Sequence, residues 1–300
     1  MNAKATNSSH SAAATQHTVG AALVVASSAF FAMSGIFTKS IASDPWTIAC
    51  WRGLVGGLLI TAYVYWRSGR DGLSISFGWR GWAMVLVAVF ASFGFIAAFK
   101  YTYVANVAII YASVPLMAAA LEWLFLGVRP RPATLGMALV CLFGVGIIVS
   151  GGLGGGHILG DVMAVGMTAA AALYMVMIRA FRDTPVVWVG AVSAYILFAF
   201  GWLVVDPLSV SAADAWRMIG FGFTFACAVV LWTEGTRLIP ATEVGVLGSA
   251  EVPFAILLAW MFLAELPPVA SMAGGAIVMA AVVFHALRSR YRPPTAPESL

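Results

Sequence analysis

The residues of this sequence that could do chemistry lie inside long apolar stretches, where polar side chains are rare. Glu251 stands two residues before Pro253, near the middle of one such stretch. An ionisable group at that depth of a membrane helix is costly and usually functional. Glu251 could bind a substrate amine or carry a proton, or it could pair with an arginine or a hydroxyl. Ser34 and Ser249 are candidate polar partners in the same kind of site. These residues predict binding or proton transfer and indicate no catalytic residue.

Aromatic residues supply the other half of the candidate site. Four lie near the centres of apolar stretches and one lies within another: Phe31, Phe95, Tyr111, Tyr174 and Trp232. Aromatic faces with a few polar groups suit flat, amphipathic organic solutes. Packing against lipid explains any single one of these residues equally well. Most of the eleven tryptophans fall near the ends of the stretches, as an interfacial belt requires.

Two prolines interrupt related stretches, and we interpret them as gating or kink residues. Pro115 and Pro253 follow a valine in both places and are 138 residues apart. Proline inside a helix removes a hydrogen bond and clashes with the preceding turn. In a membrane the freed carbonyl needs water or a polar neighbour, so a kink beside a cavity is favoured. A static kink that improves packing is the alternative.

The composition indicates an integral membrane protein. Of the 300 residues 62% are hydrophobic and 9% are charged, against roughly 25% charged in an ordinary soluble domain. A membrane-spanning helix needs about 20 apolar residues. The sequence predicts an all-α protein with ten transmembrane helices, near residues 19–40, 46–66, 80–100, 104–125, 132–150, 159–179, 186–205, 214–234, 242–263 and 268–287.

Basic residues predict the orientation. With ten helices and a cytoplasmic N-terminus, twelve of the sixteen lysines and arginines fall on the cytoplasmic side. Lys39, Lys100 and Arg217 fall outside, and Arg52 falls within a helix. The excess of basic residues on one side predicts that both termini are cytoplasmic. We expect a multi-pass protein of the bacterial inner membrane.

A repeat divides the chain into halves. Val114, Trp123 and Gly136 in the first half match Val252, Trp260 and Gly274 in the second, at offsets of 137 or 138. Lys39 and Arg179 match at 140. Because each half has an odd number of helices, the halves are expected to be inverted repeats with a site between them. We expect a disordered tail over 1–18, repeats over 19–150 and 159–288, a glycine-rich linker over 151–158 and a tail over 289–300.

The sequence lacks the signatures of several other classes. It has no His-Glu-x-x-His, no phosphate loop and no motif of an intramembrane protease. The three cysteines lie far apart in apolar stretches without histidine partners, so no metal site, disulfide or cofactor is expected. Glycines on the stretches 132–150 and 268–287 predict close helix contact, within one chain or across a homodimer.

The two repeat segments resemble a known family. The first reads FKYTYVANVAIIYASVPLMAAALEWLFLG and the second LWTEGTRLIPATEVGVLGSAEVPFAILLAWMFLAE. They are similar to the repeat of the drug/metabolite transporter superfamily, EamA type, over about residues 19–287. Within it the chain looks most similar to YddG-like aromatic amino-acid exporters. Where that family often has Leu-Gly-Glu, the first copy has Val128, so a role for that acid carries over only to Glu265.

The resemblance implies a transporter that is not an enzyme. We expect export of small organic solutes, preferably aromatic or other amphipathic amino acids, by alternating access across a lipid bilayer. A multidrug, quaternary-cation or metabolite exporter on the same fold is the alternative. A channel or a non-transporting scaffold is the alternative from a different class. No nucleic-acid partner is expected, because the net charge of +4 is loop charge.

Overall fold

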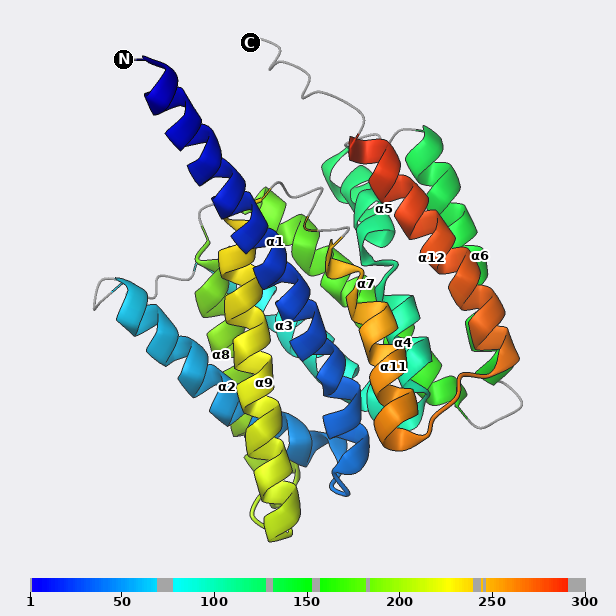
Figure 1. Cartoon of the computed structure of the whole chain (residues 1–300). Helices are drawn as coiled ribbons and strands as arrows, with labels where there is room; N and C mark the ends of the chain where they lie inside the picture. The colour runs from blue at the N-terminus through cyan, green and yellow to red at the C-terminus, as the bar shows by residue number, and fades with distance from the viewer. Residues whose placement is uncertain are drawn as a thin grey trace.

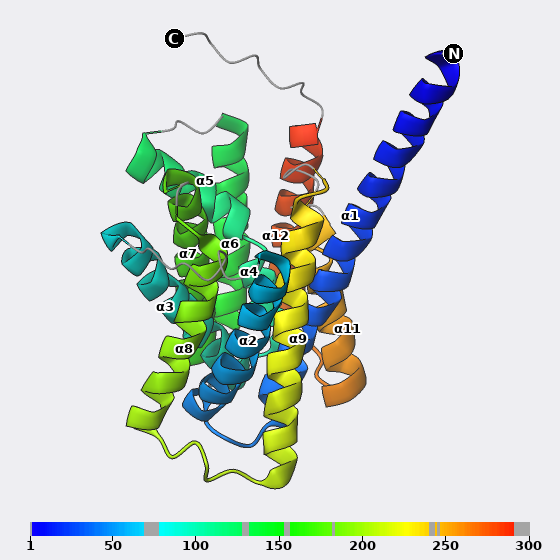
Figure 2. The same ribbon diagram turned by 90° about the vertical axis from the view of Figure 1, so that its left-hand side faces the viewer.

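The protein is a bundle of long helices, and its computed structural model describes residues 2–68, 78–127, 132–152, 157–181, 184–239, 244 and 247–290. Side chains are described between 15 and 284 within these ranges, apart from residues 68, 133 and 152. All regular structure in this part of the chain is helical. Figures 1 and 2 show that the first turns of α1 and the last turns of α12 lie at the same end of the bundle.

The first half contains six helical segments. They are α1 (Asn2–Ser40), α2 (Pro45–Ser68), α3 (Trp79–Tyr101), α4 (Val104–Tyr111), α5 (Val114–Leu126) and α6 (Pro132–Gly152). The expected tail over 1–18 was a wrong reading of this segment, because α1 begins at Asn2. The stretch before Gly20 contains several alanines and no proline or glycine, a composition that favours helix.

The second half contains α7 (Ile158–Ala180), α8 (Val186–Val204), α9 (Ala212–Thr236), α11 (Glu251–Leu263) and α12 (Val269–Arg290). The predicted helix over 242–263 is only partly seen, because residues 240–243, 245 and 246 lie outside the described ones. The predicted linker is likewise largely outside them, since 153–156 are not described. The C-terminal tail from 291 onwards is also outside the described residues.

Seven described helices are long and apolar enough to cross a membrane. The pair α4 and α5, bent by 42° at its break, makes an eighth if it is one span. Helix α11 and the apolar part of α12 are shorter, at 10–17 residues. The structure therefore shows a membrane protein of many apolar helices without confirming the predicted total of ten.

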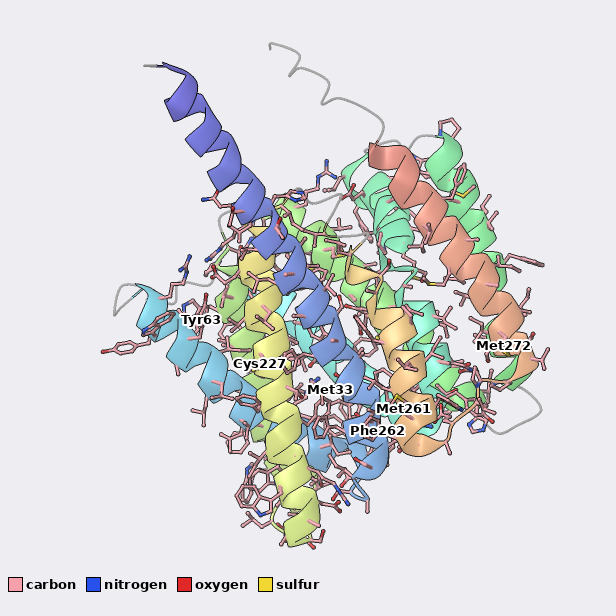
Figure 3. The ribbon with its side chains drawn as sticks, viewed as in Figure 1. Met33, Tyr63, Cys227, Met261, Phe262 and Met272 are labelled. Carbon is pink, nitrogen blue, oxygen red and sulfur yellow. The ribbon has the colours of Figure 1, made fainter. Side chains whose placement is uncertain are left out.

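The outside of the bundle is apolar, as contact with lipid requires. Large hydrophobic side chains are exposed along α3, α5, α6, α8, α11 and α12. Figure 3 labels three of them, Met261, Phe262 and Met272, and each is more than half exposed. In a bilayer these side chains face hydrocarbon, so their exposure carries no cost of contact with water.

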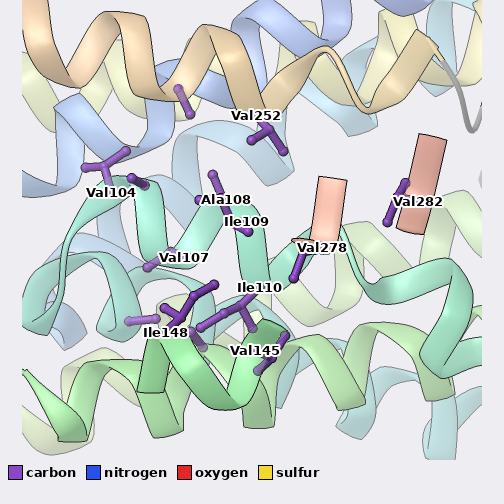
Figure 4. Packing of buried hydrophobic residues seen from close by; sticks show 14 of the residues in the cluster. Val104, Val107, Ala108, Ile109, Ile110, Val145, Ile148, Val252, Val278 and Val282 are labelled. Carbon is purple, nitrogen blue, oxygen red and sulfur yellow. The ribbon is translucent and has the colours of Figure 1, made fainter. Parts of the chain in front are cut away.

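The largest buried cluster surrounds α4. Its valines and isoleucines, among them Val104, Val107 and Ile110, pack against α6, α11 and α12, as Figure 4 shows. Every described side chain of α4 except Tyr111 is buried. This short helix from the first half is therefore enclosed largely by helices of the second half, which places the contact between the halves at the centre of the bundle.

The packing partners follow the predicted repeat. Helix α1 packs against α9, and its counterpart α7 packs against α3, the counterpart of α9. Helix α1 also packs against α11, as α7 does against α5. Two further pairs join counterparts directly: α2 with α8, and α6 with α12. A twofold relation between the halves accounts for all of these pairs.

Candidate functional site

Helices α4 and α11 pack together where the halves meet, and each lies beside a helix break. Helix α4 ends at Tyr111, and α5 begins at Val114 after a break in which the Ser113 hydroxyl donates to the Ile110 carbonyl at 2.6 Å. Helix α11 begins at Glu251, the residue that corresponds to Ser113 at an offset of 138. Since α4 and α11 pack together, the ends of these broken helices border the centre of the molecule.

The two prolines occupy equivalent places beside these breaks. Pro115 is the second residue of α5 and Pro253 is the third residue of α11. The expectation that both lie in the interior of a continuous helix was wrong, because the first turn of a helix tolerates proline without losing a hydrogen bond. Both prolines are exposed. They mark the helix breaks in the two halves.

The C-terminal ends of these two helices also correspond. Gly127 ends α5 with a φ of 67°, and Ala264 ends α11 with a φ of 52°. Left-handed backbone at an alanine is uncommon because its Cβ crowds the following carbonyl. The second copy thus keeps the turn of the first even with an unfavourable residue.

Glu251 and Tyr111 form the polar part of the centre. Glu251 is half-buried, and its carboxylate makes no hydrogen bond or ion pair with any described residue. It does act electrostatically on the half-buried Tyr111. Ser249 lies directly before the start of α11. A carboxylate without a partner at a helix break can bind a cationic group or take up a proton.

Aromatic rings surround this pair on the side of α3. The Phe95 ring meets the Tyr111 ring edge-on, with centroids 5.9 Å apart, and meets Phe99 in the same way at 4.7 Å. On the other side of the bundle, Phe31 of α1 meets Phe225 of α9 edge-on at 6.4 Å. The structure therefore brings Phe95, Tyr111 and Glu251 together and places Phe31 in a neighbouring aromatic contact.

The remaining predicted residues are dispersed. Tyr174 packs in a cluster formed with Met84, Val85 and Val189, between α3 and α8. Trp232 packs against Val24, and its ring closes on Gly248 shortly before α11. Ser34 is fully buried within α1. Of these three, Trp232 borders the break at α11, and Tyr174 is the residue most clearly outside a common site.

Sequence reasoning missed two polar groups in this region. Ser28 of α1 donates to its own helix at Val24 and also lies 3.4 Å from the carbonyl oxygen of Gly248, at the break before α11. Its neighbour Ser27 donates to the Ala228 carbonyl of α9 at 2.8 Å. The signal was present as a pair of adjacent serines in an otherwise apolar helix.

Arg52 connects three helices near the aromatic contact of Phe31. Its fully buried guanidinium donates to the Ser92 hydroxyl of α3 and lies 4.5 Å from the centroid of the Phe225 ring. A second ring, that of Phe221, lies 5.5 Å away. Contacts with two aromatic faces stabilise a buried guanidinium. Arg52 therefore joins α2, α3 and α9 and holds the ring that meets Phe31.

One apolar pocket lies beside the break of α4 and α5. Its volume is about 210 Å³, and its walls come from α5, α6 and α7. It contains none of the predicted binding residues; its lining residues are Ser113, Leu116, Met117, Ala120, Leu121, Ala138, Cys141, Leu142 and Ala169. The break thus opens a pocket away from Glu251, and the candidate site is defined by its polar groups.

Two ion pairs join equivalent pairs of helices. Lys39 at the end of α1 pairs with Glu265 after α11, with 2.9 Å between Nζ and Oε2. Arg179 at the end of α7 pairs with both carboxylate oxygens of Glu122 in α5, at 3.0 and 2.8 Å. Arg129 and Arg131, which follow α5 in the sequence, lie outside the described residues.

Glu265 has a second contact besides its ion pair, and Glu234 forms a separate charged cluster. The other carboxylate oxygen of Glu265 accepts from the backbone N–H of Val104 at 2.5 Å, so this pair also holds the start of α4. Among the charged groups elsewhere, Glu234 pairs with Arg67 and Arg237 and accepts from Tyr63, which Figure 3 labels. Glu243, expected in the same cluster, lies outside the described residues.

The centre contains no arrangement suited to a transition metal in the part of the chain that is described. No three His, Cys, Asp or Glu side chains meet there. The three cysteines are free thiols. The polar groups at the centre can therefore bind and orient an organic solute, and nothing in their geometry assembles a nucleophile with a base.

Apolar helices in two related halves, with broken helices and a carboxylate at the centre, define a membrane transport protein. The model of the EamA-like transporter family matches the chain twice, over residues 18–150 and 158–287. The chain belongs to this family, which is part of the drug/metabolite transporter superfamily.

Comparison with solved structures agrees on the fold. A structure described as "Crystal structure of protein" superposes with a TM-score of 0.63 at 20% identity, covering 92% of this chain and 98% of the other. At this identity the likeness concerns the fold alone. No curated protein matches the chain.

Proposed function

We propose that the protein is a secondary transporter that exports small organic solutes by alternating access across the bacterial inner membrane. The observation that carries this proposal is the unpaired carboxylate of Glu251, at a helix break between two related halves. In transporters with inverted repeats, substrates bind near the bilayer midplane beside such discontinuous helices. The match of one family model to both halves supports the same arrangement.

The proposal includes ten membrane spans with both termini in the cytoplasm. In this arrangement α4 with α5 forms the fourth span, and the segment ending in α11 forms the ninth. The basic residues support the orientation. Arg237 lies close to the part of α1 where Gly20 packs against Leu238 and Ile239. Lys100 and Arg217 donate to Ile41 and Ser40 at the opposite end of α1.

The preferred substrates are aromatic or other amphipathic amino acids. The amine of such a solute would lie against Glu251, and its apolar side chain would lie against the Phe95 and Tyr111 rings. The alternative cargo, a quaternary cation or a cationic drug, is favoured by the same contacts, because aromatic faces and a carboxylate suit a cation without an ammonium hydrogen. Amino acids differ from these cations in carrying a carboxylate, so a contact with that carboxylate would distinguish the two classes of substrate.

The two ion pairs would act as gates. Lys39–Glu265 and Arg179–Glu122 join equivalent helix pairs at opposite ends of the bundle, as expected if each holds one mouth closed. Opening a mouth would break its pair and separate α1 from α11, or α7 from α5. Because partly exposed ion pairs contribute about 0.2–1 kcal/mol each, they could open and close repeatedly without trapping one state.

Counterflow in liposomes tests this function. Purified protein would be reconstituted into liposomes loaded with one unlabelled solute, and uptake of the same labelled solute would be followed for amino acids and quaternary cations. We expect uptake of at least one aromatic amino acid, strongly reduced in Glu251→Ala and retained in the control Glu234→Gln, because Glu234 lies outside the centre and both gates. Uptake of cations alone would replace the preferred substrate with the alternative. No counterflow of any solute would contradict a transporter.

A further inference from the structure

A carboxylate in the first turn of α7 is fully buried and only half satisfied. Asp161 Oδ1 accepts from the Thr102 hydroxyl at 2.6 Å and from the Asn106 side-chain amide at 2.9 Å. Its second oxygen, Oδ2, is buried and has no hydrogen-bond partner in the described part of the chain. The two donors belong to the first half and the acid to the second, so the cluster joins the repeats.

Asn106 contributes a second oxygen in the same condition. Its amide nitrogen reaches Asp161 and, at 3.4 Å, the Thr102 hydroxyl. Its Oδ1 is buried without a partner among the described residues. When Asp161 is ionised, both orphan oxygens are acceptors only, and neither can satisfy the other. Unsatisfied buried acceptors are rare in folded proteins because the lost hydration is not replaced.

The charge of this cluster is also uncompensated within the described residues. No described lysine or arginine pairs with Asp161; Lys39, at this end of the bundle, is occupied by Glu265. His157 lies one turn earlier, and its Nδ1 is 3.4 Å from the Tyr101 carbonyl oxygen. The N-terminal end of α7 offsets part of a negative charge. It supplies no hydrogen bond to Oδ2 in this structure.

We propose that Asp161 Oδ2 and Asn106 Oδ1 bind a monovalent cation of the sodium class, at the junction of the α3–α4 turn with α7. Hard cations take carboxylate, amide and hydroxyl oxygens as ligands, and those are the groups gathered here. One carboxylate matches one positive charge. The described residues include no set of three His, Cys, Asp or Glu side chains that would favour a transition metal.

The place of the site gives the cation a structural consequence. Thr102 and Asn106 flank Val104, whose N–H is held by Glu265. A cation on Asp161 and Asn106 fixes the same turn against α7, while Lys39 and Glu265 fix it against α1 and α11. Cation binding therefore stabilises the closed form of this end of the bundle. The site does not depend on which solute is transported.

Thermal unfolding of the purified full chain in detergent tests the site. Sodium chloride would be titrated against choline chloride at constant ionic strength, without any solute. We expect sodium to raise Tm by a few degrees in a saturable manner, since a ligand bound only by the folded state stabilises it. Equal Tm values in sodium and choline would overturn the proposal, as expected if water bridges the two oxygens.

Two variants make the test specific. Asp161→Asn removes the charge and places an amide N–H where Oδ2 was, so it can donate to Asn106 and should fold without a response to sodium. Asp214→Asn is the matched control, because Asp214 is another buried acid and is paired with Arg217. It should retain the sodium response. A sodium response in Asp161→Asn equal to that of the original protein would contradict the site.

A third variant covers failure of Asp161→Asn to fold. Asn106→Ser keeps a small polar group but withdraws Oδ1, and it should weaken the sodium response at least tenfold in midpoint concentration. An unchanged midpoint would overturn the proposal. If the protein responds to sodium but exchanges no solute, the sodium site is supported and the proposed transport function is contradicted. Failure of the sodium site and failure of the transport function can therefore be told apart.

Discussion

At the scale of single residues, Glu251 carries the most weight. A carboxylate at the start of a helix inside an apolar bundle needs a partner, and no described residue forms a hydrogen bond or an ion pair with the Glu251 carboxylate. The missing partner is, in our account, the substrate amine or a proton. Asp161 shows the same incompleteness in a different setting, with donors on one oxygen and none on the other.

Replacing Glu251 with glutamine separates the proton role from the binding role. The amide keeps the size of the side chain but cannot change its charge. We expect Glu251→Gln to remove any dependence of transport on a pH gradient while counterflow of the solute stays measurable. Transport would be measured in liposomes with and without an imposed gradient. If the original protein ignores the gradient, Glu251 is a substrate contact alone and the proton role is wrong.

The sequence predicted the residues at the centre better than their surroundings. Glu251, Tyr111 and Phe95 meet because two helices break at equivalent places, and the repeated valine-proline pairs signalled both places. Tyr174 was assigned to the centre from its depth in an apolar stretch. The position of a residue along a helix does not say which neighbouring helix its side chain faces. Because the helix is apolar on nearly all sides, it has no polar face from which the orientation of Tyr174 could be predicted. The same uniformity hid the contact of Ser28 with α11.

At the scale of elements, breaks in helices decide the architecture. The sequence predicted kinked but continuous helices at Pro115 and Pro253, and the structure separates each proline from the preceding helix. A proline in the first turn of a helix and a proline that kinks the middle of a helix look the same in the sequence. The sequence also predicted the break between α3 and α4 correctly, because a short polar interruption separates the two apolar stretches near Lys100.

Replacing each proline with alanine tests whether the breaks act as hinges. An alanine N–H at 115 can bond to the preceding turn and favour joining α4 to α5; the same change at 253 acts on the other half. We expect opposite shifts between the two access states. Labelling rates of single cysteines near the two mouths would report them. Shifts in one direction for both variants, or none, would make the prolines packing features.

The contact of α6 with α12 depends on small residues. A Cβ at Gly274 would stand 2.7 Å from the Ile148 side chain, and a Cβ at Gly144 would stand 2.8 Å from the Gly274 carbonyl oxygen. The glycines that suggested either an internal contact or a dimer seam therefore serve an internal one at these two positions. Gly146 has open space around it.

These glycines give a matched pair of stability variants. Gly274→Ala should push α6 from α12 and destabilise the protein by about 1–3 kcal/mol. Gly146→Ala, on the same helix pair but without neighbours, should be neutral or stabilising by up to about 1 kcal/mol, because alanine favours helix over glycine. Thermal unfolding in detergent measures both. Equal effects would contradict the close contact.

At the scale of the whole molecule, the relation between the halves makes function possible. Each half supplies one broken helix to the centre, and each proposed gate joins one residue from each half. The sequence predicted this relation from repeated residues, and the match of one family model to both halves agrees with it. The ion pairs could not be predicted, because Lys39 and Arg179 correspond while their partners, Glu265 and Glu122, do not occupy equivalent positions.

The most direct test of alternating access uses one central cysteine and the two gates. Ser249→Cys would be introduced with the three native cysteines replaced, and a membrane-impermeant thiol reagent would be applied to right-side-out and to inside-out vesicles. Lys39→Gln opens the gate expected outside, and Arg179→Gln opens the gate expected inside. Loss of one exposed ion pair is worth up to about 1 kcal/mol, so labelling rates should change by about two- to fivefold.

The account predicts opposite changes in the two variants. Lys39→Gln should speed labelling from outside and slow it from inside, because the two states exchange and one gains population at the expense of the other. Arg179→Gln should do the reverse. Faster labelling from both sides in either variant would indicate a continuous pore, and the same direction of change in both variants would contradict gates on opposite sides of one central site.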